Sequence, residues 1–160
     1  MILRRAESGD IPAILGIWNP LIRNTSVTFT TVEKTAQGLA DDIAARGGAF
    51  LVAEADDGVV LGFATYGAFR AGPGYAHTAE HSVILSQQAR GQGVGRALMT
   101  QLEQQARTDK IHVLIAGVSS ENAGAIAFHR AIGFDEGPRL PEVGCKFGRW
   151  MDLILLHKRL

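Results

Sequence analysis

The sequence predicts an α/β (α+β) fold in which helices cover both faces of a mixed central sheet. Two patterns predict it. Short β-type runs alternate with helical patterns along the chain, and residues 112–118 are almost wholly apolar, as expected of a strand buried on both faces. The chain has 160 residues, of which 46% are hydrophobic, and this suits one core. We therefore expect residues 1–160 to form a single domain.

The first part of the chain is expected to form a strand and two helices. Residues 2–5 fit a strand, and Ser8 is a candidate N-cap for a helix that begins near Gly9. One stripe of that helix is apolar: Ile14, Ile17, Trp18 and Leu21. A threonine-rich loop at residues 24–31 precedes a second helix, roughly residues 32–46, which ends at a glycine pair.

Three strands follow, and a hairpin joins the first two. Residues 50–54 and 59–66 have β-type composition, and the Asp56-Asp57-Gly58 sequence between them is a hairpin turn signal. The third strand spans about residues 77–85 and follows a Gly-Pro-Gly turn at residues 72–74.

The second half of the chain alternates helices with strands. A glycine-rich loop leads into a helix whose apolar residues have near-helical spacing: Val94, Leu98, Leu102 and Ala106. The apolar strand comes next, followed by a short helix over residues 122–132 that Gly133 closes. Residues 134–139 and 147–157 are expected to complete the sheet.

The loop at residues 89–99 has the composition of an anion cradle. Glycines at 91, 93 and 95 permit positive φ and let backbone N–H groups approach a ligand, while the helix that follows adds partial positive charge. A phosphate or pyrophosphate is the natural occupant. A Walker loop requires Lys-Ser/Thr where this chain has Arg96-Ala97, and the alternating glycines do not match the dinucleotide fingerprint. A tight turn without a ligand is the remaining alternative.

Composition excludes some classes of partner. Lys+Arg and Asp+Glu number 16 each, so no global basic surface favours nucleic acid or anionic membranes. A single cysteine, Cys145, excludes an intramolecular disulfide framework and fits a reducing compartment. No run approaches 18 apolar residues and no signal peptide is evident, so we expect a cytoplasmic protein.

A competing motif lies in the strand before the glycine loop. His77-Thr-Ala-Glu80-His81 matches the His-x-x-Glu-His pattern of one class of zinc peptidases, which requires both histidines on one helical face. The β-branched residues nearby favour a strand, in which Glu80 points away from the histidines. We therefore expect no metal site and keep a zinc hydrolase only as an unfavoured alternative.

Two segments resemble the GNAT superfamily of N-acetyltransferases. The Arg90-x-x-Gly93-x-Gly95 pattern is similar to its acyl-CoA loop, and residues 122–134 are similar to its asparagine-led helix that ends in Gly-Phe. Residues 13–19, 72–83 and 143–152 further resemble the phosphinothricin and methionine sulfone/sulfoximine acetyltransferase group. The resemblance implies the acetyltransferase fold, with a mixed, mostly antiparallel sheet. It also implies transfer of acetyl from acetyl-CoA to the α-amino group of a small amino acid, by direct attack in a ternary complex, and a homodimer.

The resemblance also assigns roles to residues. Glu80 matches the catalytic glutamate and is the expected base, acting directly or through water. Backbone amides near the end of its strand, at Val83, Ile84 and Leu85, are expected to stabilise negative charge on the acetyl oxygen. The expected pyrophosphate site comprises Arg90, Gly91, Gln92, Gly93, Val94, Gly95 and Arg96. Asn122 is expected to cap its helix and to bond the pantetheine arm. His129 stands where many relatives have a tyrosine general acid, and a place on the helix surface is the alternative.

The acceptor is less closely defined than the donor. The resemblance points to the loop that contains Arg70, Pro73, Gly74 and Tyr75, together with Glu80, and Arg70 is a candidate partner for a substrate carboxylate. Ala76 and the Ile84-Leu85 pair depart from the family's arginine and Tyr-Val, which puts the exact amine in doubt. A protein N-terminus or a polyamine is an alternative acceptor, and a non-catalytic acyl-CoA sensor is an alternative function.

Overall fold

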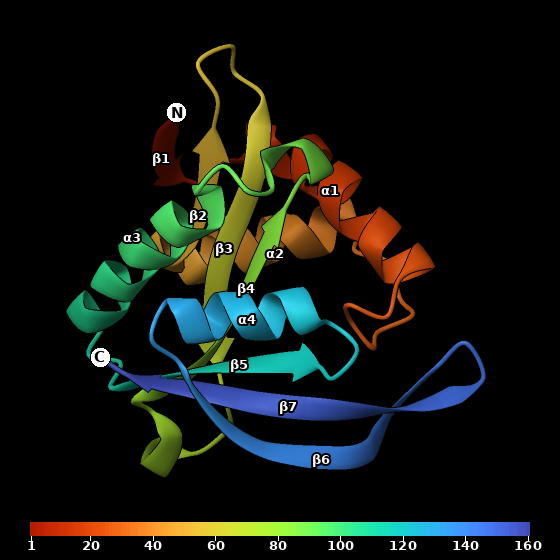
Figure 1. The fold of residues 1–160 in the computed structure, drawn as a ribbon. Helices are drawn as coiled ribbons and strands as arrows, with labels where there is room; N and C mark the ends of the chain where they lie inside the picture. The colour runs from red at the N-terminus through yellow and green to blue at the C-terminus, as the bar shows by residue number, and fades with distance from the viewer.

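The computed structural model describes residues 1–160 and contains one seven-stranded sheet with the order β1-β2-β3-β4-β5-β7-β6 (Figure 1). The strands are β1 (Ile2–Arg5), β2 (Phe50–Glu54), β3 (Val60–Ala68), β4 (Thr78–Leu85), β5 (Val113–Ser119), β6 (Asp135–Lys146) and β7 (Arg149–Arg159). The helices are α1 (Ile11–Asn24), α2 (Ala36–Arg46), α3 (Val94–Thr108) and α4 (Ala123–Ala131). Only β4 and β5 pair in parallel, which confirms the predicted mixed, mostly antiparallel sheet.

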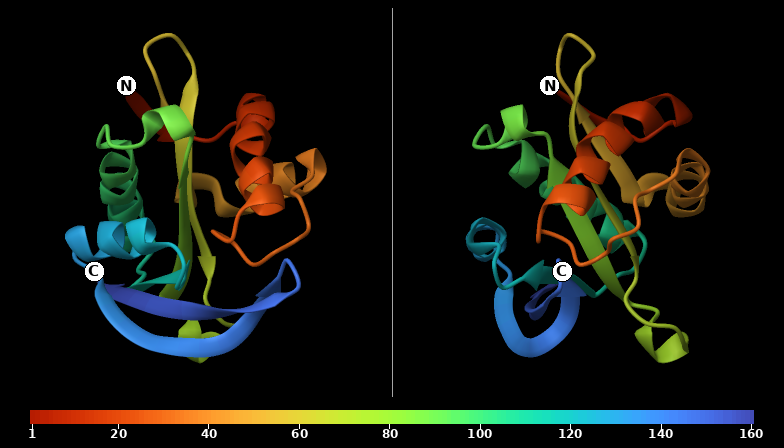
Figure 2. Two further views of the ribbon diagram at one scale, coloured as in Figure 1. Left: turned by 45° about the vertical axis from the view of Figure 1, so that its right-hand side comes forward. Right: turned by 90° about the vertical axis from the view of Figure 1, so that its right-hand side faces the viewer.

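Helices cover both faces of the sheet, as predicted. Helices α1 and α2 pack on one face and α3 and α4 on the other (Figure 2). The core beneath α1 and α2 contains Phe50 and Phe63, which are fully buried, and the core beneath α3 contains Leu98 and Leu114. Burial of such side chains contributes about 1.5–3 kcal/mol each and holds the two layers together. None of the helices combines the length and hydropathy that a membrane crossing would need.

Strands β4 and β5 separate soon after they begin. Their parallel ladder comprises three residue pairs, the last of which is Glu80 with Ile115. Beyond this pair, β4 continues beside β3 while β5 turns away beside β7 (Figure 1). The divergence leaves a gap in the sheet, and α4 follows directly from the far end of β5. The gap is the feature of the fold that positions the site.

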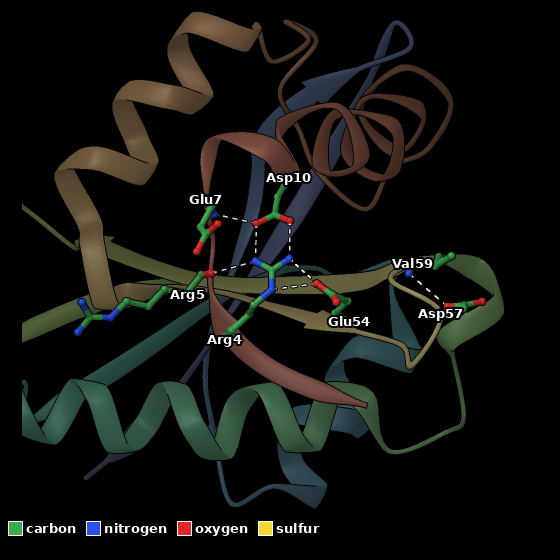
Figure 3. Close-up of polar contacts among 7 residues, drawn as sticks. All are labelled: Arg4, Arg5, Glu7, Asp10, Glu54, Asp57 and Val59. Carbon is green, nitrogen blue, oxygen red and sulfur yellow. Dashed lines mark hydrogen bonds and ion pairs between the residues drawn. The ribbon is translucent and has the colours of Figure 1, made fainter.

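The N-terminal strand is tied to its surroundings by a charged cluster (Figure 3). The guanidinium of Arg4 donates to both carboxylate oxygens of Asp10, each at 2.8 Å, and to Glu54 of β2. The backbone N–H of Glu7 donates to Asp10 at 2.7 Å. The hydrogen bonds from Arg4 hold the pKa of Asp10 below its ordinary value. The cluster connects β1, β2 and the start of α1.

Three predicted boundaries are wrong. Residues 8–10 form a short 3-10 turn, and α1 begins at Ile11. The second helix begins at Ala36 rather than near residue 32, because Thr35 caps it by accepting a hydrogen bond from the N–H of Gly38 at 3.1 Å. Strand β6 extends from residue 135 to 146 rather than ending at 139. It lies at the edge of the sheet, and its two prolines fall where its register with β7 shifts.

Candidate active site

The glycine loop adopts the geometry of an anion cradle. Gly91 and Gly93 have φ values of +76° and +79°, which few other residues tolerate, and Gly93 is the N-cap of α3. The first helical bond runs from the N–H of Ala97 to the carbonyl of Gly93, so the amides of residues 94–96 have no helical partner. An added Cβ at Gly95 would lie 3.3 Å from the ring of Phe128, so a larger residue there would press on this ring.

A cavity of about 380 Å³ lies beside this loop. Among the predicted donor-site residues, it is lined by Val83, Ile84, Leu85, Arg90, Gly91, Gly95 and Asn122. Gln92, Gly93, Val94 and Arg96 do not line it. The guanidinium of Arg96 donates to the carbonyl of Ala131 at 3.3 Å, and the side chain of Gln92 donates to the carbonyl of Gln88 at 2.7 Å. The structure therefore brings together the strand end, part of the loop and the start of α4.

Backbone amides of β4 face the gap in the sheet. Ser86 donates its N–H to Leu61, and Phe69 donates to the carbonyl of Thr78, so the even-numbered residues of β4 exchange hydrogen bonds with β3. The N–H groups of Val83 and Leu85 consequently point toward β5, which has already diverged. These two amides are free to bind a ligand in the cavity, whereas the amide of Ile84 is paired with β3.

A second cavity, of about 250 Å³, passes through the gap. Side chains of β4 alternate between the faces of the sheet, yet Glu80 and Ser82 of one face and His81 and Val83 of the other all line it. The two cavities share seven lining residues: Leu21, Val27, Val83, Ile84, Asn122, Ala125 and His129. They are therefore adjoining parts of one site.

Glu80 lies on the α1–α2 face of this second cavity. Its carboxylate makes no hydrogen bond or ion pair in the structure and lies against the backbone of Gly117 in β5. Burial raises the pKa of Glu80 above its ordinary value, because partial removal from water disfavours the charged carboxylate. A carboxylate with a raised pKa, open to a cavity, has the properties of a general base.

His129 and His81 form a buried pair on the opposite face. Their Nε2 atoms are 3.0 Å apart, and Nδ1 of His129 lies 2.7 Å from the carbonyl of Ala125. Both ring nitrogens of His129 are thus bound within the protein. Burial lowers the pKa of His81 and of His129, which keeps both rings neutral at pH 7. The structure places His129 at the junction of the cavities without a free nitrogen.

Asn122 caps α4, as the sequence predicted. Its Oδ1 accepts a hydrogen bond from the N–H of Ala125 at 3.1 Å. The side chain also lines both cavities, so its amide nitrogen is available to a ligand.

The loop after α1 forms a wall that sequence reasoning missed. Val27, Thr28 and Phe29 line the second cavity. The buried ammonium of Lys146 donates to the carbonyls of Thr25 and Thr28, each at 2.7 Å, and holds this wall in place. An added Cβ at Gly144 would clash with the ring of Phe29. The signal was in the 143–152 motif, which contains both Gly144 and Lys146.

The loop that was predicted to bind the acceptor lies on the protein surface, outside both cavities. Arg70, Pro73, Gly74 and Tyr75 are exposed between β3 and β4, and none of them lines either cavity. The guanidinium carbon of Arg70 lies 5.4 Å from the centre of the Phe69 ring. Their substrate role stays a prediction.

The zinc alternative loses its structural basis. Residues 78–85 form a strand rather than a helix, His77 bonds the carbonyl of Lys110, and His81 pairs with His129. The structure brings no three His, Cys, Asp or Glu side chains into a group suited to a metal ion.

Comparison with known proteins now identifies the family. A model of the acetyltransferase (GNAT) family matches residues 18–134. The chain belongs to this family. The L-methionine sulfoximine/L-methionine sulfone acetyltransferase of Pseudomonas aeruginosa is 39% identical over 161 residues, which cover 99% of this chain and 94% of the relative. The predicted family and the enzyme class, N-acetyltransferase, are thereby confirmed.

Solved GNAT structures share the whole fold. A ribosomal-protein-alanine N-acetyltransferase from Brucella melitensis superposes with a TM-score of 0.94 and 40% identity, and the match covers all of both chains. The yncA acetyltransferase of Salmonella typhimurium, whose structure contains acetyl-CoA, has a TM-score of 0.94 and 36% identity over 100% of this chain and 94% of that one.

Proposed function

We propose that this acetyltransferase transfers an acetyl group from acetyl-CoA to the α-amino group of a small amino acid or analogue of the methionine sulfone, methionine sulfoximine or phosphinothricin type. The observation that carries the proposal is the joining of the two cavities through the gap between β4 and β5. Donor and acceptor can occupy opposite sides of the sheet and meet in the gap. This arrangement favours direct transfer in a ternary complex.

The first cavity suits the donor. The glycines with positive φ, the unpaired amides of residues 94–96 and the guanidinium of Arg90 would hold the pyrophosphate. The amides of Val83 and Leu85 and the side chain of Asn122 would hold the pantetheine arm and polarise the acetyl carbonyl. Acetyl-CoA supplies the acetyl group as an activated thioester. Gln92, Gly93, Val94 and Arg96 do not line the cavity, and we propose that they contact the pyrophosphate from the outer side of the loop.

The second cavity suits a small acceptor. Its volume, about 250 Å³, lies just below the range of about 300–1,000 Å³ typical of pockets for larger ligands. Glu80 is the one charged group in its lining, which argues against a polyamine, since a polyamine has two or more cations to neutralise. Glu80 takes a proton from the ammonium or the attacking amine, and its raised pKa suits that task near neutral pH.

His129 remains a predicted general acid. In the neutral ring the proton lies on Nδ1, which donates to the carbonyl of Ala125, so Nε2 would first have to gain a proton, such as the one that the amine loses, and exchange its bond with His81 for one to the sulfur. The neutral pair also shapes the wall between the two cavities, and this second role needs no such exchange.

A panel of acceptors tests the proposal. Release of CoA thiol is measured with methionine sulfone, methionine sulfoximine, phosphinothricin, diamines and short peptides. We expect the amino acid analogues to react with the highest kcat/KM and to give intersecting initial-rate lines, as a ternary complex requires. Preferential reaction of peptides that begin with alanine would instead favour the activity named for the Brucella relative. Tight CoA binding without turnover would favour a sensor.

We also propose that the enzyme acts as a homodimer in the cytoplasm. The exposed Val143, Phe147 and Trp150 beside the β6–β7 turn offer an apolar surface for a second copy, and a single cysteine suits a reducing compartment. Light scattering at several protein concentrations tests the dimer, and a monomer mass throughout would contradict it.

A further inference from the structure

Gly117 of β5 faces the proposed base directly. Glu80 and Ile115 are paired across the parallel ladder, and Gly117 is two residues further along β5, on the same face. A Cβ built on Gly117 would lie 2.8 Å from Oε1 of Glu80 and 3.6 Å from Cδ1 of Leu153. The carboxylate therefore occupies the space that a side chain at position 117 would fill.

The Glu80 side chain is exposed and its carboxylate has no polar partner, and its close approach to the structure is at Gly117. The recess is bounded by the backbone of Gly117 and the side chain of Leu153 of β7. On the other flank, Glu80 faces Gly67 of β3, where an added Cβ would have nothing closer than the Arg46 guanidinium at 3.8 Å. The close constraint thus comes from the β5 side alone.

From these contacts we infer that Gly117 is a positioning residue for the acetyltransferase reaction: its missing side chain creates the recess that aims the Glu80 carboxylate and partly withdraws it from water. This inference rests on the proposed role of Glu80. Burial raises the pKa of Glu80, and the recess over Gly117 is part of that burial.

Charged groups nearby do not provide a competing explanation for that pKa. On the β3 side, the Arg46 guanidinium of α2 lies beside Gly67 and bonds Asp42 and Thr65. The exposed His157 is the ladder partner of Ile115 on β7, and β7 lies two strands away from the strand of Glu80. The His81–His129 pair on the opposite face stays neutral. A cation near Glu80 would also lower its pKa rather than raise it.

Substitution of Gly117 by alanine separates positioning from folding. Gly117 has no positive φ, so alanine fits the backbone, and alanine is no worse than glycine within a strand. The contact of 2.8 Å is with the end of a flexible side chain, which must move by roughly 1 Å to reach an ordinary contact distance. Gly117→Ala should therefore fold normally and displace the carboxylate toward the open cavity.

The kinetic experiment is a double-mutant cycle. Gly117→Ala should lower kcat about 10–100-fold with an unchanged KM for acetyl-CoA, because a displacement near 1 Å can cost this much. In a Glu80→Gln background, the same change should alter kcat less than twofold. Gly67→Ala is the matched control, since it places a methyl on the other flank of Glu80 at ordinary contact distance from the Arg46 guanidinium, and it should leave kcat unchanged. An equal loss in both backgrounds would overturn the inference.

A titration decides the matter without turnover. Carbon-13 NMR of the protein labelled at glutamate carboxyls, with Glu80→Gln used for assignment, gives the pKa of Glu80 directly. Gly117→Ala should lower this pKa toward the ordinary value, and Gly67→Ala should not. An unchanged pKa in Gly117→Ala overturns the inference even if the acceptor panel succeeds. A lowered pKa supports it even if no acceptor in the panel reacts, in which case the proposed function alone fails.

Discussion

The glycine loop and the part of the β4–β5 gap around Glu80 lie at opposite ends of the joined cavities and present different kinds of group. The loop offers backbone: the amides of residues 94–96 and glycines held at positive φ. The gap offers side chains from separate elements, among them Glu80 and the wall that Lys146 holds. Backbone groups suit a donor common to a whole family, whereas side chains can change with the acceptor without disturbing the donor site.

The two ends also differ in what holds their binding groups in place. At the donor end, the amides are fixed by the helix that they begin, so few other contacts are needed to aim them. At the acceptor end, Glu80 has no polar partner, and its direction depends on the recess over Gly117. Substitutions at the two ends should therefore separate in kinetics, the donor end affecting the KM for acetyl-CoA and the acceptor end affecting kcat or the KM for the amine.

The largest effect is expected from Glu80→Gln. The amide has nearly the same shape but cannot accept the proton, so kcat should fall about 10²–10⁴-fold. Binding of acetyl-CoA, measured by calorimetry, should stay within twofold of the parent enzyme, because Glu80 does not line the donor cavity. A large loss of acetyl-CoA affinity would contradict the separation of the two ends.

Gly93→Val tests the donor end. A β-branched residue at φ +79° costs about 1–3 kcal/mol and should distort the start of α3. The KM for acetyl-CoA should rise about 10-fold or more, while the KM for the amine changes little. Gln92→Ala is the neighbouring control, since its side chain bonds only the carbonyl of Gln88. If both KM values rise together, the loop also supports the acceptor site.

The fold and the donor end could be predicted because each depends on residues close in sequence. Alternating patterns located the strands and helices, and the glycines of the cradle stand within one short segment. The predicted start of α2 was wrong because the Thr35 cap outweighed the apolar Val32, and the length of β6 was missed because its register with β7 shifts twice.

The acceptor end could not be predicted in the same way. Lys146 acts on carbonyls 121 and 118 residues earlier in the chain, and no local pattern reports such contacts. Gly117 matters only because β5 pairs with β4 at Glu80. Arg70 and Tyr75 were assigned from the resemblance, and they lie outside the cavities of one chain.

Lys146→Met tests the wall of the acceptor end. The variant keeps the length of the side chain but loses the two hydrogen bonds to the carbonyls of Thr25 and Thr28. We expect the free energy of unfolding to fall by about 2 kcal/mol and Tm by about 4–8 °C. The KM for the amine should rise several-fold. Lys110→Met, which removes an exposed lysine, is the control, and a KM effect of equal size there would contradict the assignment to the wall.

The smallest effect concerns the neutral histidine pair between the two ends. In the unfolded chain each imidazole has a pKa near 6.5, whereas burial lowers the pKa of both in the folded protein. Below pH 6.5 the unfolded chain therefore binds more protons, so the free energy of unfolding falls as pH is lowered from 7.5 to 5.5, by about 1–2 kcal/mol. Urea unfolding at these pH values measures the change. His81→Phe should reduce it, whereas His112→Gln, which removes an exposed histidine, should not. If His81→Phe leaves the pH dependence intact, the dependence arises from other groups, and burial does not lower the pKa of His81.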